Sequence, residues 1–344
     1  MKFSLLFFSQ IEGEPNGSPY RLILEAAQYT DAHGFEAVWI PERHFSSVGG
    51  IYPNPAVIAS ALAATTDQIR LRSGSVVLPL HHPVSVVEDW AAVDQLSGGR
   101  VDLAFASGWN PRDFLFSPQS FSNRRSDWLE RIPVIQSIWR KGSTVVANSD
   151  GVEVKVDVYP RPVQPELSIW LTVTRLKESF EIAGSMGLNV LTMLSGITLQ
   201  QLSENIKIYR NARNAAGIDP SSGIVTLMMH TYIHEDIGTV RQRVSGPLMR
   251  YLKDSAKTHL DGGAISMNIS RSEREIERIA EYSFERYFAT AALFGDVETT
   301  KLTVEKLTAA GVDEIASMID FGLSVEHALE GLNYLQKLKN SRRN

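Results

Sequence analysis

The sequence contains no cysteine at all, which fits a cytoplasmic protein. This absence excludes disulfide bonds, thiolate nucleophiles and metals bound by cysteine. The sequence also lacks an uncharged apolar run of about 18 residues, so we expect no membrane-spanning helix. The apolar stretch at the amino terminus ends at Phe8, and no small-residue cleavage site follows it. We therefore expect a first strand there and no signal peptide.

An excess of positive charge is missing too. The 34 Lys and Arg residues are outnumbered by 39 Asp and Glu residues, so the net charge is −5 and nothing favours a nucleic-acid partner. No G-x-x-x-x-G-K-[ST] phosphate loop occurs, and SQIEGEPNGS at 9–18, after the first apolar run, holds no G-x-G-x-x-G dinucleotide motif. SGS at 73–75 does not form the G-x-S-x-G turn of a serine hydrolase.

What the sequence does contain is an alternation of strand-like and helix-like segments along its 344 residues. Nearly continuous apolar runs predict buried parallel strands. These runs are Phe3–Ser9, Ala37–Pro41, Ile69–Leu78, Val101–Ser107, Ile169–Thr174, Asn189–Leu194, Ile224–His234 and Asp313–Ile319. The pattern predicts an α/β fold, a closed (β/α)8 TIM barrel with insertions, as a single domain over 1–344. The rival, a doubly wound open sheet, would normally carry the missing dinucleotide motif.

Helical periodicity fills the intervals between these strands. We expect the first helix to begin at Pro19 with Ser18 as its N-cap, and further helices at about 55–66, 83–97, 123–140, 199–216 and 325–338. Residues 143–158 alternate as a hairpin does and interrupt the pattern as an insertion. Residues 236–292 are expected to be helical at both ends, with a mobile loop around His259–Ser270 acting as a lid.

Ionisable residues cluster directly after the second strand. Glu42, Arg43 and His44 follow a buried strand, and in a barrel the chemistry lies at the carboxyl ends of strands. One interpretation makes His44 a proton donor or acceptor whose charge is set by its two neighbours. The other is a structural salt bridge with a histidine bonded to the backbone. The residues alone do not separate the two.

A metal site is the weaker interpretation of the histidines. His81 and His82 follow the third strand and His44 offers a third ligand, but no histidine or carboxylate at i+4 spacing accompanies the pair. HEDIG at 234–238 lacks the second histidine of a zinc motif. We therefore expect no metal, and a structural role for the pair that opens the next helix.

Polar residues at two helix starts suit an anion. Arg125 lies just inside the helix after the fourth strand, and Thr174 and Ser179 flank the start of the helix after the fifth. Hydroxyls, free N–H groups and a guanidinium at helix N-termini are typical of a phosphate site. Ordinary capping by Thr174 and a surface position for Arg125 explain the same residues equally well.

Three segments, taken together, resemble the bacterial luciferase-like flavin-dependent monooxygenases. They are AHGFEAVWIPERHF at 32–45, the block at 52–114 that ends in GWNPRDF, and ERYFATAALFGDVE at 285–298. The resemblance implies a barrel that binds reduced FMN, supplied by a separate flavin reductase, and uses O2 to oxygenate its substrate. GWNPRDF and FERYF are most similar to the natural-product biosynthesis subfamily, which implies a biosynthetic intermediate, free or tethered to a carrier protein.

The resemblance also implies site residues. Luciferases carry two adjacent histidines after the strand-two glutamate; Arg43 takes the first, catalytic position here and only His44 matches, which argues against aldehyde oxidation with light emission. A non-prolyl cis peptide of the family, beneath the flavin ring, aligns with Gly74–Ser75. Ser107 replaces a phosphate-binding arginine, and Arg175, in an unusual turn at 174–177, is the candidate to restore that charge or to fill part of the site. The expected catalytic residues are Glu42, Arg43 and His44, and the expected flavin contacts are Gly74, Ser75, Ser107, Gly108, Trp109, Asn110, Arg125, Thr172, Thr174, Arg175 and Ser179.

Two alternatives remain open: a deazaflavin-dependent oxidoreductase of the same fold, and a flavin-binding protein without activity. Relatives associate through early barrel helices, so the resemblance also implies a homodimer. The helix of 55–66 is almost wholly apolar or small, and the helix after Pro83 adds Val86 and Trp90. Together they carry more apolar surface than one buried stripe needs.

Overall fold

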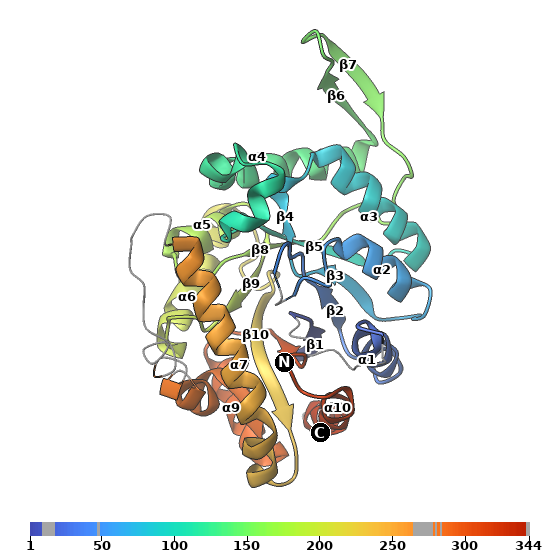
Figure 1. Cartoon of the computed structure of the whole chain (residues 1–344). Coiled ribbons are helices and arrows are strands. Elements are labelled where there is room, and N and C mark those ends of the chain that lie inside the picture. The colour runs from blue at the N-terminus through green and yellow to red at the C-terminus, as the bar shows by residue number, and fades with distance from the viewer. Residues whose placement is uncertain (9–17, 47–48, 264–277, 279–280, 283, 342–344) are drawn as a thin grey trace.

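Eight parallel strands close into a barrel in the computed structural model, which describes residues 1–8, 18–46, 49–263, 278, 281–282 and 284–341 (Figure 1). Each strand pairs in parallel with its neighbours, and the ring closes where the first strand pairs with the last. The barrel strands are β1 Lys2–Leu6, β2 Ala37–Ile40, β3 Arg70–Ser73, β5 Val101–Ala106, β8 Ile169–Thr172, β9 Asn189–Met193, β10 Val225–Ile233 and β12 Glu314–Met318. Seven lie within the predicted apolar runs and β1 begins one residue before its run, so the predicted fold class is confirmed.

The third predicted strand is interrupted. β3 ends at Ser73, the Gly74–Ser75 peptide bond is cis, and a short β4 (Val76–Val77) then pairs with β5 before the 3-10 turn η1 (Leu78–Leu80). The backbone therefore changes direction within an apolar run that the sequence presents as continuous. The cis bond lies where the resemblance placed it.

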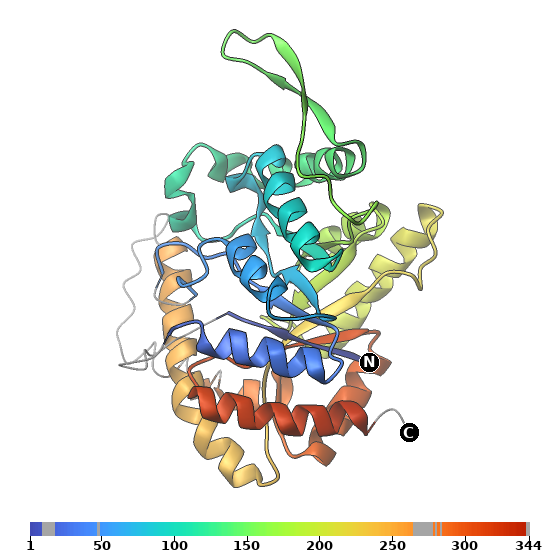
Figure 2. The same cartoon turned by 90° about the vertical axis from the view of Figure 1, so that its right-hand side faces the viewer.

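A ring of helices covers the barrel, and α1 and α10 lie side by side where the ring closes (Figure 1, Figure 2). The helices are α1 Arg21–Ala32, α2 Pro55–Ala63, α3 Pro83–Ser97, α4 Ser120–Lys141, α5 Lys177–Ser185, α6 Leu199–Ala215, α9 Val297–Ala309 and α10 Val325–Asn340. The predicted start of α1 is wrong: Ser18 and Pro19 form a turn in which the Ser18 hydroxyl accepts from Tyr20 N–H, and the helix begins at Arg21. None of the helices in these described ranges is long and apolar enough to cross a membrane.

The connection after β10 differs most from expectation. The helix α7 (Ile237–Gly263) follows β10, and the helical turn η3 (Tyr287–Ala291) leads into the strand β11 (Ala292–Gly295). β11 pairs with the outer half of β10, where helix was expected up to residue 292. Residues 259–263 of the expected lid loop belong to α7, so that part of the prediction is wrong, and residues 264–270 lie outside the described residues.

The expected insertion is an antiparallel hairpin that projects away from the barrel (Figure 1, Figure 2). β6 (Ser143–Ala147) pairs with β7 (Glu153–Asp157), and no residue of either strand is buried. This confirms the alternation read from 143–158.

One argument for a dimer is wrong. Val86 and Trp90 are only 3% and 2% exposed, because α3 packs them inside the same chain. The large apolar side chains that stay exposed on these helices are Val57 and Leu96, each 62% exposed. The surplus on the outer face is therefore smaller than the sequence indicates.

The inward face of the barrel changes character from the amino end to the carboxyl end. Near the amino end, Arg72 is buried and bonded to Asp102 (Nε to Oδ2, 2.7 Å) and to Glu314 (Nη1 to Oε1, 2.9 Å). Its guanidinium carbon lies 4.8 Å and 4.5 Å from the ring centroids of Trp39 and Trp170. The carboxyl end instead carries the residues singled out as a site.

Candidate active site

Two histidines converge on one buried carboxylate at the carboxyl ends of strands two and three. Glu42, which follows β2, is 4% exposed. Its Oε1 lies 2.8 Å from His44 Nε2 and 2.7 Å from His81 Nε2. Its Oε2 accepts a 2.7 Å hydrogen bond from the Val77 N–H. Glu42 therefore ties two neighbouring strand ends together and holds His44 in one orientation.

The charge of this cluster follows from its contacts. Burial raises the pKa of the Glu42 carboxyl, but hydrogen bonds from His44, His81 and the Val77 N–H outweigh it and hold that pKa below its usual value. Burial lowers the pKa of His81, and the adjoining Glu42 outweighs burial and raises it. Glu42 is thus an anion at neutral pH. If His44 donates from Nε2 to that anion, Nδ1 is the nitrogen left for proton transfer.

Arg43 packs against two aromatic rings. Its guanidinium carbon lies 5.0 Å from the Trp109 ring centroid and 5.3 Å from that of Phe8. Its Nη1 is 3.4 Å from Asp113 Oδ2, and Asp113 also accepts from the His44 backbone N–H at 3.3 Å. Burial raises the pKa of Asp113, and Arg43 opposes that shift. Arg43 and Asp113 therefore position the loop that carries His44, and the sequence reading missed Asp113.

His82, the second histidine of the predicted structural pair, does cap a helix. Its Nδ1 accepts from the Val84 N–H at the start of α3, at 3.2 Å. Its neighbour His81 instead joins Glu42. The pair therefore splits between helix capping and the buried carboxylate.

Ser75, just after β3, and Thr172, the last residue of β8, are two predicted flavin contacts that lie together. The hydroxyl groups of Ser75 and Thr172 form a hydrogen bond across the barrel mouth. A Cβ on Gly74 would lie 3.0 Å from Trp39 Cβ, so a larger residue would press on the barrel interior. This corner therefore carries small polar side chains above a tightly packed interior.

Close packing shapes the loop that follows β5. Gly108 has φ +76°, and a Cβ there would lie 2.7 Å from the Phe114 ring. Asn110 is buried, and its side chain accepts from Arg112 N–H and donates to Asp113. Trp109 is 42% exposed between them, and Ser107 is half-buried. These residues shape the wall of the mouth, with Trp109 as its exposed surface.

The amino-terminal end of α5, which follows β8, can accept an anion. Within the described residues no side chain caps α5, whose N-cap is Leu176, so the capping role considered for Thr174 is wrong. Thr174 and Arg175 are exposed and Ser179 is buried in the first turn. A helix start without a side-chain cap, with hydroxyls and a cation beside it, fits a phosphate.

Arg125, the predicted phosphate contact on α4, has a second arginine, Arg124, beside it. Arg125 is exposed, whereas Arg124 is half-buried and donates from Nε to the Gly108 carbonyl at 3.2 Å. Arg124 lies four residues before the buried Trp128, which places it on the inner face of α4. The four-residue spacing from Trp128 is the signal by which Arg124 could have been found in the sequence.

His230 is a further inward-facing residue that the sequence reading missed. It lies in β10 beside Met318, the last residue of β12, and is 1% exposed. The ring centroids of Tyr251, Phe321 and Tyr287 lie 4.8, 5.4 and 5.7 Å from its own. Burial lowers its pKa to about 3, and Nδ1 finds no hydrogen-bond partner within the described parts of the chain. A neutral imidazole in an aromatic box can hydrogen-bond a polar group of a bound molecule.

Comparisons with known proteins agree with this geometry. The model of the luciferase-like monooxygenase family matches residues 1–314. The oxygenase component of a flavin-dependent trigonelline monooxygenase from Acinetobacter baylyi is 26% identical over 339 residues, covering 95% of this chain and 91% of that protein. The crystal structure of the monooxygenase RslO1 from Streptomyces bottropensis has a TM-score of 0.83 at 22% identity, with both chains fully covered. The oxygenating constituent of 3,6-diketocamphane monooxygenase from Pseudomonas putida, in complex with FMN, has a TM-score of 0.74 at 16% identity over 98% of this chain and 96% of that one.

Proposed function

The chain belongs to the luciferase-like monooxygenase family, and we propose that it is the oxygenase of a two-component flavin-dependent system. In this proposal it takes reduced FMN from a separate flavin reductase and uses O2 to oxygenate a natural-product intermediate, free or tethered to a carrier protein. The observation that carries the proposal is the Glu42–His44 pair at the carboxyl end of the barrel.

The residues present fit reduced FMN at two places. The uncapped start of α5, with Thr174, Arg175 and Ser179, would hold the phosphate. The corner formed by Gly74, Ser75 and Thr172 would lie beneath the ring, where only small side chains leave room. The FMN complex of the 3,6-diketocamphane enzyme and the name of the Acinetobacter relative support a flavin.

The chemistry divides between the flavin and the chain. A bound reduced flavin supplies the two electrons with which O2 gives one oxygen atom to the substrate and one to water. His44 moves a proton at Nδ1 while Glu42 keeps the ring oriented and balances its charge. Trp109 and Phe116 help to exclude water, since the Phe116 ring centroid lies 4.9 Å from that of His44.

The test is an anaerobic titration with reduced FMN, reduced FAD and reduced deazaflavin, followed by exposure to 18O2 with a panel of biosynthetic intermediates. We expect reduced FMN to bind more tightly than reduced FAD, because the residues proposed to bind phosphate lie close together and suit a single phosphate group. One 18O atom should appear in a product. Binding of the deazaflavin alone would favour the dehydrogenase or reductase alternative. Flavin binding without a labelled product from any intermediate would favour the non-catalytic one.

We also propose a homodimer formed through α2. Its outer face presents Val57, which is 62% exposed, with Ala61 and Ala64 also exposed. Small side chains on an exposed helix allow close packing across a two-fold axis. Light scattering at micromolar concentration should give twice 38.2 kDa. Val57→Lys should shift it toward the monomer, while Leu302→Lys, at a similarly exposed leucine on α9, should not.

A further inference from the structure

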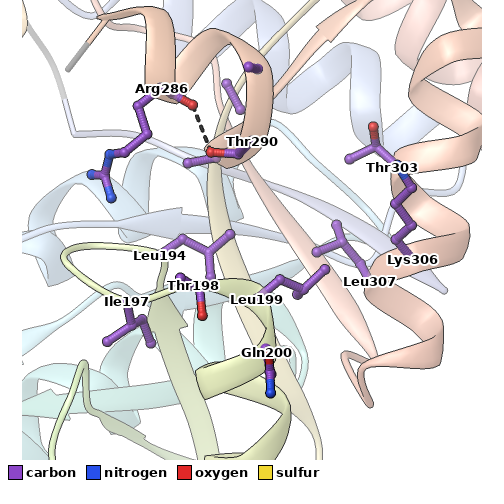
Figure 3. A pocket seen from close by; sticks show the side chains of 13 residues that line it. Leu194, Ile197, Thr198, Leu199, Gln200, Arg286, Thr290, Thr303, Lys306 and Leu307 are labelled. Atoms are coloured by element: carbon purple, nitrogen blue, oxygen red, sulfur yellow. Dashed lines mark hydrogen bonds between the residues drawn. The ribbon is translucent and has the colours of Figure 1, made fainter. Parts of the chain in front are cut away.

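A further pocket lies just beyond the carboxyl end of β9, where Leu194 follows the strand. It has a volume of about 490 Å3 and opens between the start of α6, the turn η3 and the helix α9 (Figure 3). In the ring of helices α6 packs on α5 and α9 packs on α10, so the pocket occupies the interval between these two pairs. Its volume falls in the range of roughly 300–1,000 Å3 that small-molecule sites have.

The floor of the pocket is aliphatic. Leu194, Leu307 and Ala291 are 4%, 2% and 6% exposed, and Ile197 and Leu199 complete the apolar lining. No aromatic ring is among the described residues that line it. The floor therefore suits an alkyl body in place of a planar ring.

Two cations stand above this floor on opposite sides. Figure 3 shows Arg286 on one wall and Thr303 with Lys306 on the other, with Leu194, Leu199 and Leu307 between them. Neither Arg286 nor Lys306 makes an ion pair with any residue that the structure describes. The guanidinium of Arg286 lies over the Tyr287 ring, at 5.3 Å to its centroid, which limits its motion. Two cations left without a counter-charge beside an apolar floor call for an amphiphilic anion.

From these features we propose that the pocket is a second small-molecule site, which binds an aliphatic carboxylate. Its alkyl chain packs on Leu194 and Leu307, and its carboxylate accepts from Arg286 or Lys306. The start of α6 lies at the same pocket, although the Thr198 hydroxyl is already used to cap Gln201 N–H. The lining shares no residue with the proposed flavin contacts, although a Cβ on Gly196, next to Ile197, would lie 3.4 Å from Arg175 Cδ. Because the test below is made without flavin, its failure is distinguishable from failure of the proposed function.

The test measures octanoate binding by calorimetry or ligand-observed NMR, without flavin. We expect a dissociation constant below about 1 mM, weakened about tenfold by Arg286→Gln or Lys306→Gln. Ala289→Trp, which places a large ring in the pocket lining, should abolish binding. Lys301→Gln is the matched control, because Lys301 lies on α9 outside the lining.

Three results would overturn the proposal. They are no binding of octanoate to the unaltered protein, unchanged binding in the Arg286→Gln and Lys306→Gln double variant, and equally tight binding of 1-octanol. Circular dichroism and thermal unfolding show whether each variant is folded. We expect the Arg286 and Lys306 variants to fold, since neither cation takes part in a described ion pair.

Discussion

The two ends of the barrel treat buried polar groups in opposite ways. At the amino end the buried Arg72 bonds to both Asp102 and Glu314, and Glu314 also accepts from the Ser4 hydroxyl at 2.6 Å. At the carboxyl end, Glu42 is shared between two histidines, and His230 Nδ1 has no partner within the described chain. Fully satisfied polar groups stabilise a fold, whereas unused hydrogen-bonding capacity is available to a ligand. The comparison assigns stability to one end and chemistry to the other.

The largest effect is expected at the carboxyl end. His44→Ala should lower turnover by about 10²–10⁴ and leave the free energy of unfolding nearly unchanged, because Glu42 keeps its bonds to His81 and Val77. Product formation with the substrate found by the 18O screen measures the first, and urea unfolding the second. His327→Ala, in the first turn of α10, is the control and should change neither. Loss of folding in His44→Ala would favour the structural interpretation of this histidine.

The reverse result is expected at the amino end. Arg72→Met should lower the free energy of unfolding by about 3–5 kcal/mol, because it leaves Glu314 buried without its cation. Arg21→Met, which removes exposed ion pairs, should cost less than about 1 kcal/mol. Urea unfolding compares the two. A loss below about 1 kcal/mol for Arg72→Met would remove the distinction between the ends.

An intermediate effect is expected for flavin affinity. Arg125→Ala should weaken the binding of reduced FMN by roughly 1.5–3 kcal/mol if its guanidinium contacts the phosphate, with little effect on stability. Arg124→Ala is the informative partner, because Arg124 holds the Gly108 carbonyl. Unchanged affinity in Arg125→Ala would exclude that contact. Weaker binding only in Arg124→Ala would transfer the role to the inner face of α4.

The smallest effect is a change in acid sensitivity. Burial holds the pKa of folded His230 at about 3, below its ordinary value near 6.5, so the unfolded chain binds more protons as the pH falls. The contribution to stability is present above pH 6.5 and is lost toward pH 3, by roughly 1.5 kcal/mol between pH 6.5 and 5. His230→Phe should reduce the slope of unfolding free energy against pH in that window. An equal slope in His230→Phe and the unaltered protein would contradict the lowered pKa.

The barrel was predictable because its signal is local. Eight buried strands must be apolar almost throughout, and the helices between them must repeat every 3.6 residues. β11 was missed because ATAAL reads as helix, and only the projecting half of β10 makes it a strand. Capping was one of the two interpretations of Thr174, and it fails because the helix begins three residues later, at Lys177. Errors of this kind arise where distant segments, not local preference, fix the backbone.

The site was predictable only in part for a similar reason. Glu42 and His44 are two residues apart, so their pairing could be anticipated from the strand that precedes them. His81 joins them only because β2 and β3 are neighbours, and it was interpreted with His82 as a helix start. His230 lies within the apolar run MMHTYI, and its aromatic neighbours come from α7, η3 and the segment after β12. Its environment is set by tertiary packing, which no local pattern reveals.

The hairpin of β6 and β7 belongs to neither end of the barrel. At its base the Val158 N–H donates to the Gly142 carbonyl at 2.8 Å, so the chain leaves and returns at a single point. No residue of either strand is buried, and the barrel is closed without them. The hairpin can therefore be lengthened, shortened or replaced without any change in the packing of the core. A recognition element could be inserted at this point while the strands and helices of the barrel stay as they are.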